Sequence, residues 1–217
     1  MTSDGLSDLR ELRELIARAD ERALAAGGVA CLERCLPLLG DAAADPEALR
    51  PLWAALGNGP AHWSARLAEA RESLKGPPER DTGGDTDAAD AADGLGADAV
   101  RAMLESAPAE WATGPLRTWA DECSAVSLAL HRRYGTGITT GATGTTGIID
   151  NADDIDAATP ADPLTAGELR RQIRILNLLA DGVGTAGLRQ ALNAATEGRR
   201  VLAAAVSRRA RGGGPRT

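Results

Sequence analysis

The residues of this sequence that most resemble a metal-binding set are its few cysteines and histidines. Cys31 and Cys35 are four positions apart, so a helix would place both thiols on one face. With His62, Cys123 and His131 they offer the sulfur and nitrogen ligands that zinc accepts. Structural zinc pairs are usually closer to a Cys-x2-Cys spacing, and the other three residues would have to be brought in by the fold. We therefore interpret Cys31 and Cys35 as small buried apolar side chains, and we expect no metal ion and no cofactor.

The sequence lacks the patterns of nucleophilic catalysis. Such catalysis needs a serine or cysteine beside a histidine that an acid orients. The Gly-x-Ser-x-Gly elbow does not occur, and His62 and His131 are the two histidines. His131 precedes Arg132 and Arg133, and we interpret it as positive charge at the negative end of a helix dipole. We expect no catalytic residues and classify the protein as not an enzyme.

Two tracts resemble ligand-binding loops in their amino-acid composition. Residues 135–147 are rich in Gly and Thr, but they lack the Lys that a phosphate-binding loop requires. Residues 150–156 contain Asp at four positions, yet the third, sixth and twelfth positions of a calcium loop starting there do not fit. We interpret both tracts as flexible linker, with a short β-hairpin over 138–149 as the alternative for the first.

The secondary structure predicted for this sequence is helical. The sequence has no Phe, one Tyr and four Trp, and its apolar residues are dominated by Ala and Leu, which favour helix. Apolar residues at three- and four-residue steps predict helices within 7–75, 116–134 and 164–209. We expect an all-α fold, a multi-helix bundle of about eight helices with two flexible low-complexity insertions.

The first helix shows the clearest pattern. It is predicted to begin after Ser7 as N-cap and to stop at Gly27-Gly28. A second short helix would then carry Cys31 and Cys35 and end near Pro37.

Two heptad seams are predicted in the later helices. The first consists of Leu116, Trp119, Cys123, Val126 and Leu130. The second consists of Leu169, Ile173, Leu176, Ala180 and Val183. Both are short, and such seams are typical of contacts within an antiparallel bundle.

Composition divides the chain into five segments. Residues 1–76 form an N-terminal four-helix segment, and 77–96 an acidic linker that cannot bury enough surface to order itself. Residues 97–135 form a middle helical segment, followed by a Gly/Thr/Asp-rich flexible linker over 136–163. Residues 164–217 form a basic α-hairpin and tail. The sequence leaves open whether the helical segments share one core, although the middle one is too small to be stable alone.

Charge is distributed unevenly between these segments. The net charge is −7, but residues 164–217 contain ten Arg against three acidic residues, a net of +7. Residues 1–163 contain 14 basic and 28 acidic residues, a net of −14. Such a split indicates either different partners for the two parts or neutralisation of one by the other.

No stretch of the sequence predicts a membrane helix or a signal peptide, since apolar runs stay well below the ~18 residues that a span needs. Three cysteines without a scaffold spacing fit a reducing compartment. We therefore expect a cytoplasmic protein with no membrane partner.

These observations favour a non-enzymatic helical protein-interaction or regulatory protein, whose partner is another protein or a second copy. Trp is enriched at binding hot spots, so the candidate interface residues are the four tryptophans. They are Trp53, Trp63, Trp111 and Trp119. Ordinary anchoring in the core is the alternative for each of them.

The basic C-terminal helices, 164–212, suggest a DNA-binding transcriptional regulator as a second hypothesis. Leu164-Thr165, then 175–183 with its Leu-Leu-Ala-x-Gly turn, then Leu188 and Leu192, are similar to the LuxR-type helix-turn-helix. The resemblance covers about 30 residues and implies that the second helix enters the major groove. The candidate contacts are Arg189, Gln190, Asn193, Arg199, Arg200, Arg208, Arg209 and Arg211.

The same segment departs from that pattern and has another interpretation. One extra helical turn separates Leu164-Thr165 from Gly182, and Arg189 stands where a small packed residue is expected. An α-hairpin that completes the bundle, with its Arg face paired to the acidic 1–163 region, is the alternative. A third hypothesis is a small-ligand-binding helical protein or enzyme with a pocket between helices.

Overall fold

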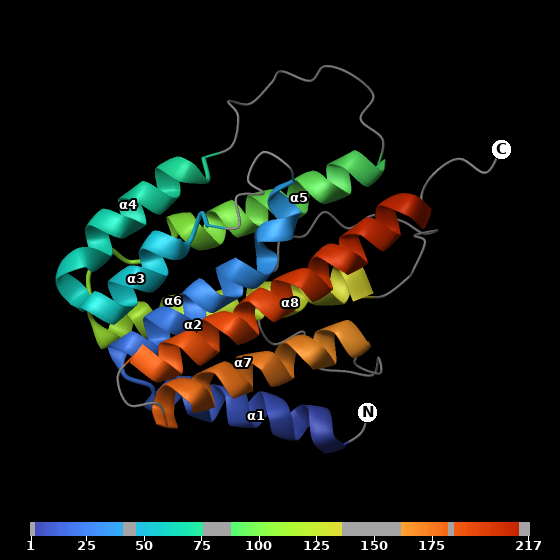
Figure 1. Ribbon diagram of the computed structural model, residues 1–217. Helices are drawn as coiled ribbons and strands as arrows, with labels where there is room; N and C mark the ends of the chain where they lie inside the picture. The colour runs from blue at the N-terminus through green and yellow to red at the C-terminus, as the bar shows by residue number, and fades with distance from the viewer. Residues whose placement is uncertain (1–2, 41–46, 76–87, 136–161, 182–184, 213–217) are drawn as a thin grey trace.

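The computed structural model describes residues 3–40, 47–75, 88–135, 162–181 and 185–212 (Figure 1). Within these ranges every regular element is helical, and the predicted all-α multi-helix bundle is confirmed. The elements are α1 (Ser3–Arg18), α2 (Glu21–Cys35), η1 (Leu36–Leu39), α3 (Arg50–Asn58), η3 (Pro60–His62), α4 (Trp63–Ser73), α5 (Ala88–Glu105), α6 (Thr113–Gly135), α7 (Pro163–Asp181) and α8 (Thr185–Gly212).

Helix α2 lies at the centre of the bundle and packs against α6, α7 and α8. Helices α7 and α8 form an antiparallel hairpin, and α1 covers α7 on its other side (Figure 1). Helices α3 and α4 pack on each other at one end, and α5 lies across η1. The three mutually packed helices α2, α6 and α7 therefore enclose the space in which buried functional groups would lie.

The break between the first two helices lies earlier than predicted. Asp20 caps α2, because its carboxylate accepts a hydrogen bond of 2.8 Å from the backbone N–H of Ala23. The predicted N-cap at Ser7 and the predicted stop at Gly27-Gly28 are wrong, since α1 begins at Ser3 and both glycines lie inside α2. A Cβ atom on Gly28 would lie 2.6 Å from Cη2 of Trp119, so this glycine permits close packing of α2 on α6.

Helix α5 also begins earlier than predicted, at Ala88 instead of Ala97. Four alanines between 88 and 92 favour helix strongly enough to offset Gly94 and Gly96. Residues 88–96 are therefore helical, and the prediction of an acidic linker over 77–96 is wrong for this part. Residues 76–87 and 136–161 lie outside the described residues, and so do the linker, hairpin and loop interpretations made for them.

Among the described residues, one hydrophobic cluster contains side chains from all three helical segments. Leu24 of α2, Trp119 of α6 and Ile175 of α7 are each at most 1% exposed and belong to it. Leu116, Trp119, Cys123 and Leu130 of the first predicted seam are buried, and Val126 packs against the core while partly exposed. Among the described helices, none combines the length and apolar character needed to span a membrane.

Candidate functional site

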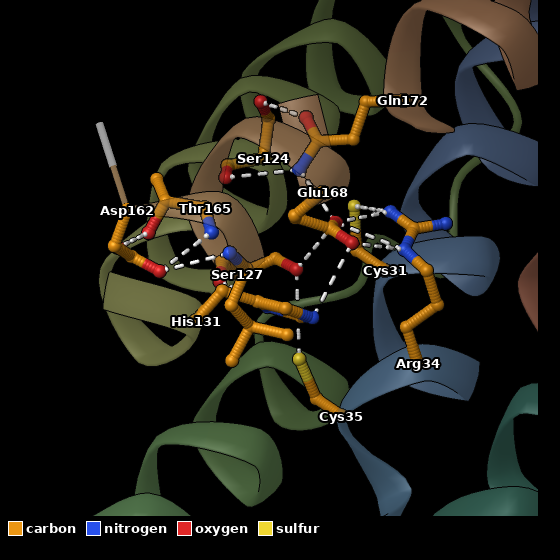
Figure 2. Close-up of polar contacts among 11 residues, drawn as sticks. Cys31, Arg34, Cys35, Ser124, Ser127, His131, Asp162, Thr165, Glu168 and Gln172 are labelled. Carbon is orange, nitrogen blue, oxygen red and sulfur yellow. Dashed lines mark hydrogen bonds and ion pairs between the residues drawn. The ribbon is translucent and has the colours of Figure 1, made fainter. Parts of the chain in front are cut away.

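A buried ion pair joins α2 to α7 at the centre of the bundle (Figure 2). Nε of Arg34 lies 2.9 and 2.8 Å from the two carboxylate oxygens of Glu168, and its Nη2 lies 2.7 Å from Oε1. The two side chains are 1% and 0% exposed. Removing two charges from water costs several kcal/mol per ion, which the pair offsets through close contact and further hydrogen bonds. Among the described residues, Nη1 of Arg34 has no hydrogen-bond partner.

The partners of Glu168 come from α6 and from its own helix. Ser127 Oγ and Gln172 Nε2 each donate a hydrogen bond of 2.8 Å to Oε1. Ser124 Oγ in turn donates to Oε1 of Gln172 over 2.6 Å. Burial raises the pKa of Glu168, but Arg34, His131 and the hydrogen bonds outweigh it and lower the pKa to about 2. The carboxylate is therefore ionised at neutral pH.

His131 completes the network from the last turns of α6. Its Nδ1 lies 2.7 Å from the backbone oxygen of Ser127, and its Nε2 lies 3.4 Å from Oε2 of Glu168. Burial lowers the pKa of His131 although Glu168 raises it, so the ring is neutral at pH 7. Because a backbone oxygen can only accept, Nδ1 is the donor in its contact with Ser127. The interpretation of His131 as a charge facing the helix dipole is wrong, because the side chain is fully buried.

The cysteines of the predicted metal set lie around this network. Cys31 Sγ accepts a bond of 3.2 Å from Arg34 Nη2, and Cys35 Sγ lies 3.6 Å from Ser127 Oγ. Burial raises the pKa of Cys31 to about 11, so the thiol is neutral and unreactive at pH 7. His62 lies exposed in η3, outside the network, while Cys123 is buried on α6. Over the described ranges no three His, Cys, Asp or Glu side chains are placed to hold a metal ion.

The sequence did not predict this network because its members on α7, Glu168 and Gln172, are polar residues in a buried face. The buried face of α7 consists of Glu168, Leu169, Gln172, Ile175 and Leu176. The predicted seam is therefore wrong in register: Ile173 is half-buried and Ala180 is exposed, while Val183 lies outside the described residues. Glu168, Gln172 and Ile175 follow at steps of four and three, a helical period that becomes visible only when polar residues are admitted to the core face.

The network is closed to solvent and has little room for a ligand. A cavity of about 20 Å³ lies beside Arg34, Cys31, Ser124 and Gln172. That volume is close to what one water molecule needs. The arrangement can hold charge and fix the register of three helices, and it offers no space for a substrate.

A second charged region lies open on the surface, in a groove of about 600 Å³ between α1 and α7. Its acidic wall carries Asp8 and Glu11 of α1, and its basic wall carries Arg170 and Arg174 of α7. None of these four side chains forms a salt bridge with another described residue. The rest of the lining is Ile173, Asn177, Leu178 and Asp181.

The four tryptophans predicted as interface residues lie in or against the core. Trp53, Trp63 and Trp119 are 6%, 0% and 1% exposed, and half-buried Trp111 stacks edge-on against Trp63 at 5.5 Å between ring centroids. The indole N–H groups of Trp63 and Trp119 donate to Pro108 and Met103 backbone oxygens over 2.7 and 2.8 Å. The tryptophans thus anchor the helices and present little surface to a partner.

The predicted nucleic-acid contacts on α8 divide into engaged and exposed residues. Arg199 forms a 2.7 Å salt bridge with buried Glu33 of α2, and Arg209 packs on the end of α6. The exposed members are Arg189, Gln190, Asn193, Arg200, Arg208 and Arg211. Helices α7 and α8 run antiparallel side by side (Figure 1), whereas helix-turn-helix pairs cross at about 90–120°.

The function must be inferred from these geometries. No family model, no curated protein and no solved structure matches this chain.

Proposed function

We propose that this protein is a non-enzymatic helical interaction protein that docks a second copy of itself in the groove between α1 and α7. The observation that carries the proposal is the groove itself, with an acidic wall on α1 and a basic wall on α7. Elsewhere the cavity beside the ion pair accepts little more than a water molecule. An open groove with apolar side chains between charged walls is suited to another helical surface.

The two walls make the groove self-complementary. Helices α1 and α7 run side by side in the same direction (Figure 1). A two-fold axis parallel to the groove exchanges its two walls and so sets α1 of each copy against α7 of the other, with the position along the groove unchanged. The acidic pair Asp8 and Glu11 then meets the basic pair Arg170 and Arg174 twice in one assembly.

In the proposed dimer, the apolar part of the groove provides the contact area. The charged side chains determine how the two copies align along the groove. Ile173 and Leu178 are half-buried in the monomer, so a second copy removes their remaining apolar surface from water. Each exposed charge pair contributes about 0.2–1 kcal/mol. We therefore expect an assembly that dissociates on dilution and weakens in high salt.

Sedimentation velocity over a concentration series tests the proposal. The wild-type chain should shift from monomer to dimer as concentration rises towards about 100 μM, an affinity typical of weak assemblies. Arg170→Glu with Arg174→Glu should keep the chain monomeric, because both walls of the groove are then acidic.

Arg189→Glu with Arg200→Glu is the matched control. It makes the same charge change on exposed positions of α8, outside the groove, and should leave dimer formation intact. A wild-type chain that stays monomeric throughout the series would refute the proposal, as would equal loss in the control variant.

A further inference from the structure

One end of the bundle collects arginines from two helices that are far apart in the sequence. The C-terminal turns of α6 carry Arg132 and Arg133, and those of α8 carry Arg208, Arg209 and Arg211. In Figure 1 the yellow end of α6 lies close to the red end of α8. We call these five arginines the basic end.

A specific contact holds the two halves of the basic end together. Nη1 of Arg209 donates a hydrogen bond of 2.9 Å to the backbone oxygen of Arg133. The guanidinium carbon of Arg209 lies 5.4 Å from the ring centroid of Tyr134, a distance at which cation–π attraction acts. Tyr134 itself is buried. The relative position of the α6 and α8 arginines is therefore set by the fold.

The basic end keeps an excess of positive charge after its local neutralisation. The C-termini of α6 and α8 each carry about half a negative charge, and the Asp162 carboxylate adds one more at this end, so that together they offset about two of the five arginines. Asp162 lies close to Gly135 and caps α7, since its carboxylate accepts the backbone N–H groups of Leu164 and Thr165. Arg132, Arg208, Arg209 and Arg211 are exposed, and Arg133 is half-buried.

We propose that the basic end binds the phosphate backbone of duplex nucleic acid without reading its sequence. The guanidinium groups of the basic end can form paired hydrogen bonds with phosphate oxygens. The amide side chains suited to base edges, Gln190 and Asn193, are exposed near the other end of α8. Asn193 is about 22 Å along the helix from Arg208, so it lies outside the basic end.

A lipid surface fits these residues less well. Peripheral membrane binding combines positive charge with a substantial apolar face. Among the described residues the large exposed apolar side chains are Leu6 on α1 and Leu95 on α5. One or two leucines on separate helices do not form such a face, whereas backbone binding to nucleic acid needs charge alone.

Fluorescence anisotropy of a labelled 20-base-pair duplex, titrated with the full chain, tests this proposal. We expect a dissociation constant of about 10⁻⁴–10⁻⁶ M near physiological salt. If all five arginines contact phosphate, log K should fall with log salt concentration at a slope of about −4 to −5. Affinity should then drop by about 10²–10³-fold between 50 and 200 mM salt, equally for duplexes of unrelated sequence.

Two double variants and one control locate the binding. One variant carries Arg132→Gln with Arg133→Gln, and the other carries Arg208→Gln with Arg211→Gln. Each should weaken binding and reduce the magnitude of the slope of log K against log salt concentration by about 2. Arg209 stays unchanged because it joins the two helices. Arg189→Gln with Arg200→Gln removes the same charge from exposed positions outside the basic end and should leave the slope unchanged.

Four outcomes would overturn the proposal. They are no duplex binding at 50 mM salt, the same loss in the control as in the basic-end variants, no effect of the α6 variant, and binding to phosphatidylserine vesicles without binding to duplex. Circular dichroism and sedimentation of each variant check that the fold and the self-association persist. Loss of duplex binding in a normally assembled variant separates this proposal from the one made for the groove.

Discussion

Helix α7 presents charged side chains on two faces, and the two faces have opposite environments. Glu168 faces inward and is fully buried against Arg34, Ser127 and Gln172. Arg170 and Arg174 face outward into the groove, exposed and without a salt bridge among the described residues. The inner charge is completed within the chain and fixes the fold. The outer charges form no salt bridge among the described residues, and in our proposal they bind a second copy, so that one helix would serve stability on one side and assembly on the other.

Loss of the inner ion pair should have the largest effect on stability. Arg34→Met leaves the carboxylate of Glu168 buried without its counter-charge, which costs about 3–5 kcal/mol of unfolding free energy. Urea denaturation followed by circular dichroism measures the loss. Arg34→Met combined with Glu168→Leu should recover most of it, because no uncompensated charge remains. A double variant no more stable than the single one would contradict this account of the pair.

Acidification should lower the unfolding free energy in two stages, the first through His131 and the second through Glu168. The pKa of His131 lies below its ordinary 6.5 in the folded protein, so the unfolded chain takes up that proton first. The unfolding free energy therefore falls as the pH drops below about 6.5. Glu168, with its pKa lowered from 4.5 to about 2, stabilises fully above about 4.5 and loses its contribution as the pH approaches 2.

Denaturation curves between pH 8 and pH 2 measure both stages. His131→Asn should remove the first stage and keep the second. A wild-type stability that rises on acidification from pH 7 to pH 5 would show that the sign assigned to His131 is incorrect.

Close packing around Arg34 predicts a smaller loss. A Cβ atom on Gly198 of α8 would lie 2.5 Å from Cδ of Arg34, so Gly198→Ala must displace the stem of a buried side chain. Overpacking of this kind costs about 1–3 kcal/mol, reduced by the ~1 kcal/mol that Ala gains over Gly in a helix. Gly27→Ala, whose Cβ would meet Leu176 at 3.5 Å, is the matched control and should not destabilise.

Substitution of the groove arginines Arg170 and Arg174 should have the smallest effect on folding stability. Arg170→Glu with Arg174→Glu changes exposed side chains that lack an internal salt bridge, so the unfolding free energy of the monomer should change by less than about 1 kcal/mol. Thermal denaturation at a dilution where the wild type is monomeric measures this. A loss comparable to that of Arg34→Met would mean that the outer charges also hold the fold.

The sequence predicted the helical content better than the internal polar contacts. Helix seams such as Leu116, Trp119 and Cys123 were found because apolar residues recur at helical steps. The stop at Gly27-Gly28 was mistaken because a glycine that ends a helix and one that admits Trp119 look alike in sequence. Only the packing of α2 on α6 distinguishes them.

The two charged regions could not be predicted for different reasons. Glu168 and Arg34 are 134 positions apart, so nothing local marks them as partners, and a lone Glu in an amphipathic helix is usually exposed. The groove depends on α1 lying beside α7, which follows from tertiary packing and not from either helix alone. The sequence shows that the C-terminal part of α8 is rich in arginine, but only the fold brings these residues close to Arg132 and Arg133 of α6.

Mixing two wall variants tests the central claim, that the groove is a docking surface for a second copy. Asp8→Arg with Glu11→Arg makes both walls basic, and Arg170→Glu with Arg174→Glu makes both walls acidic. Each variant alone should sediment as a monomer because like charges oppose each other across the two-fold axis. An equimolar mixture should form a one-to-one dimer at a concentration where neither variant dimerises. A mixture that remains monomeric, while wild type dimerises, would contradict the claim.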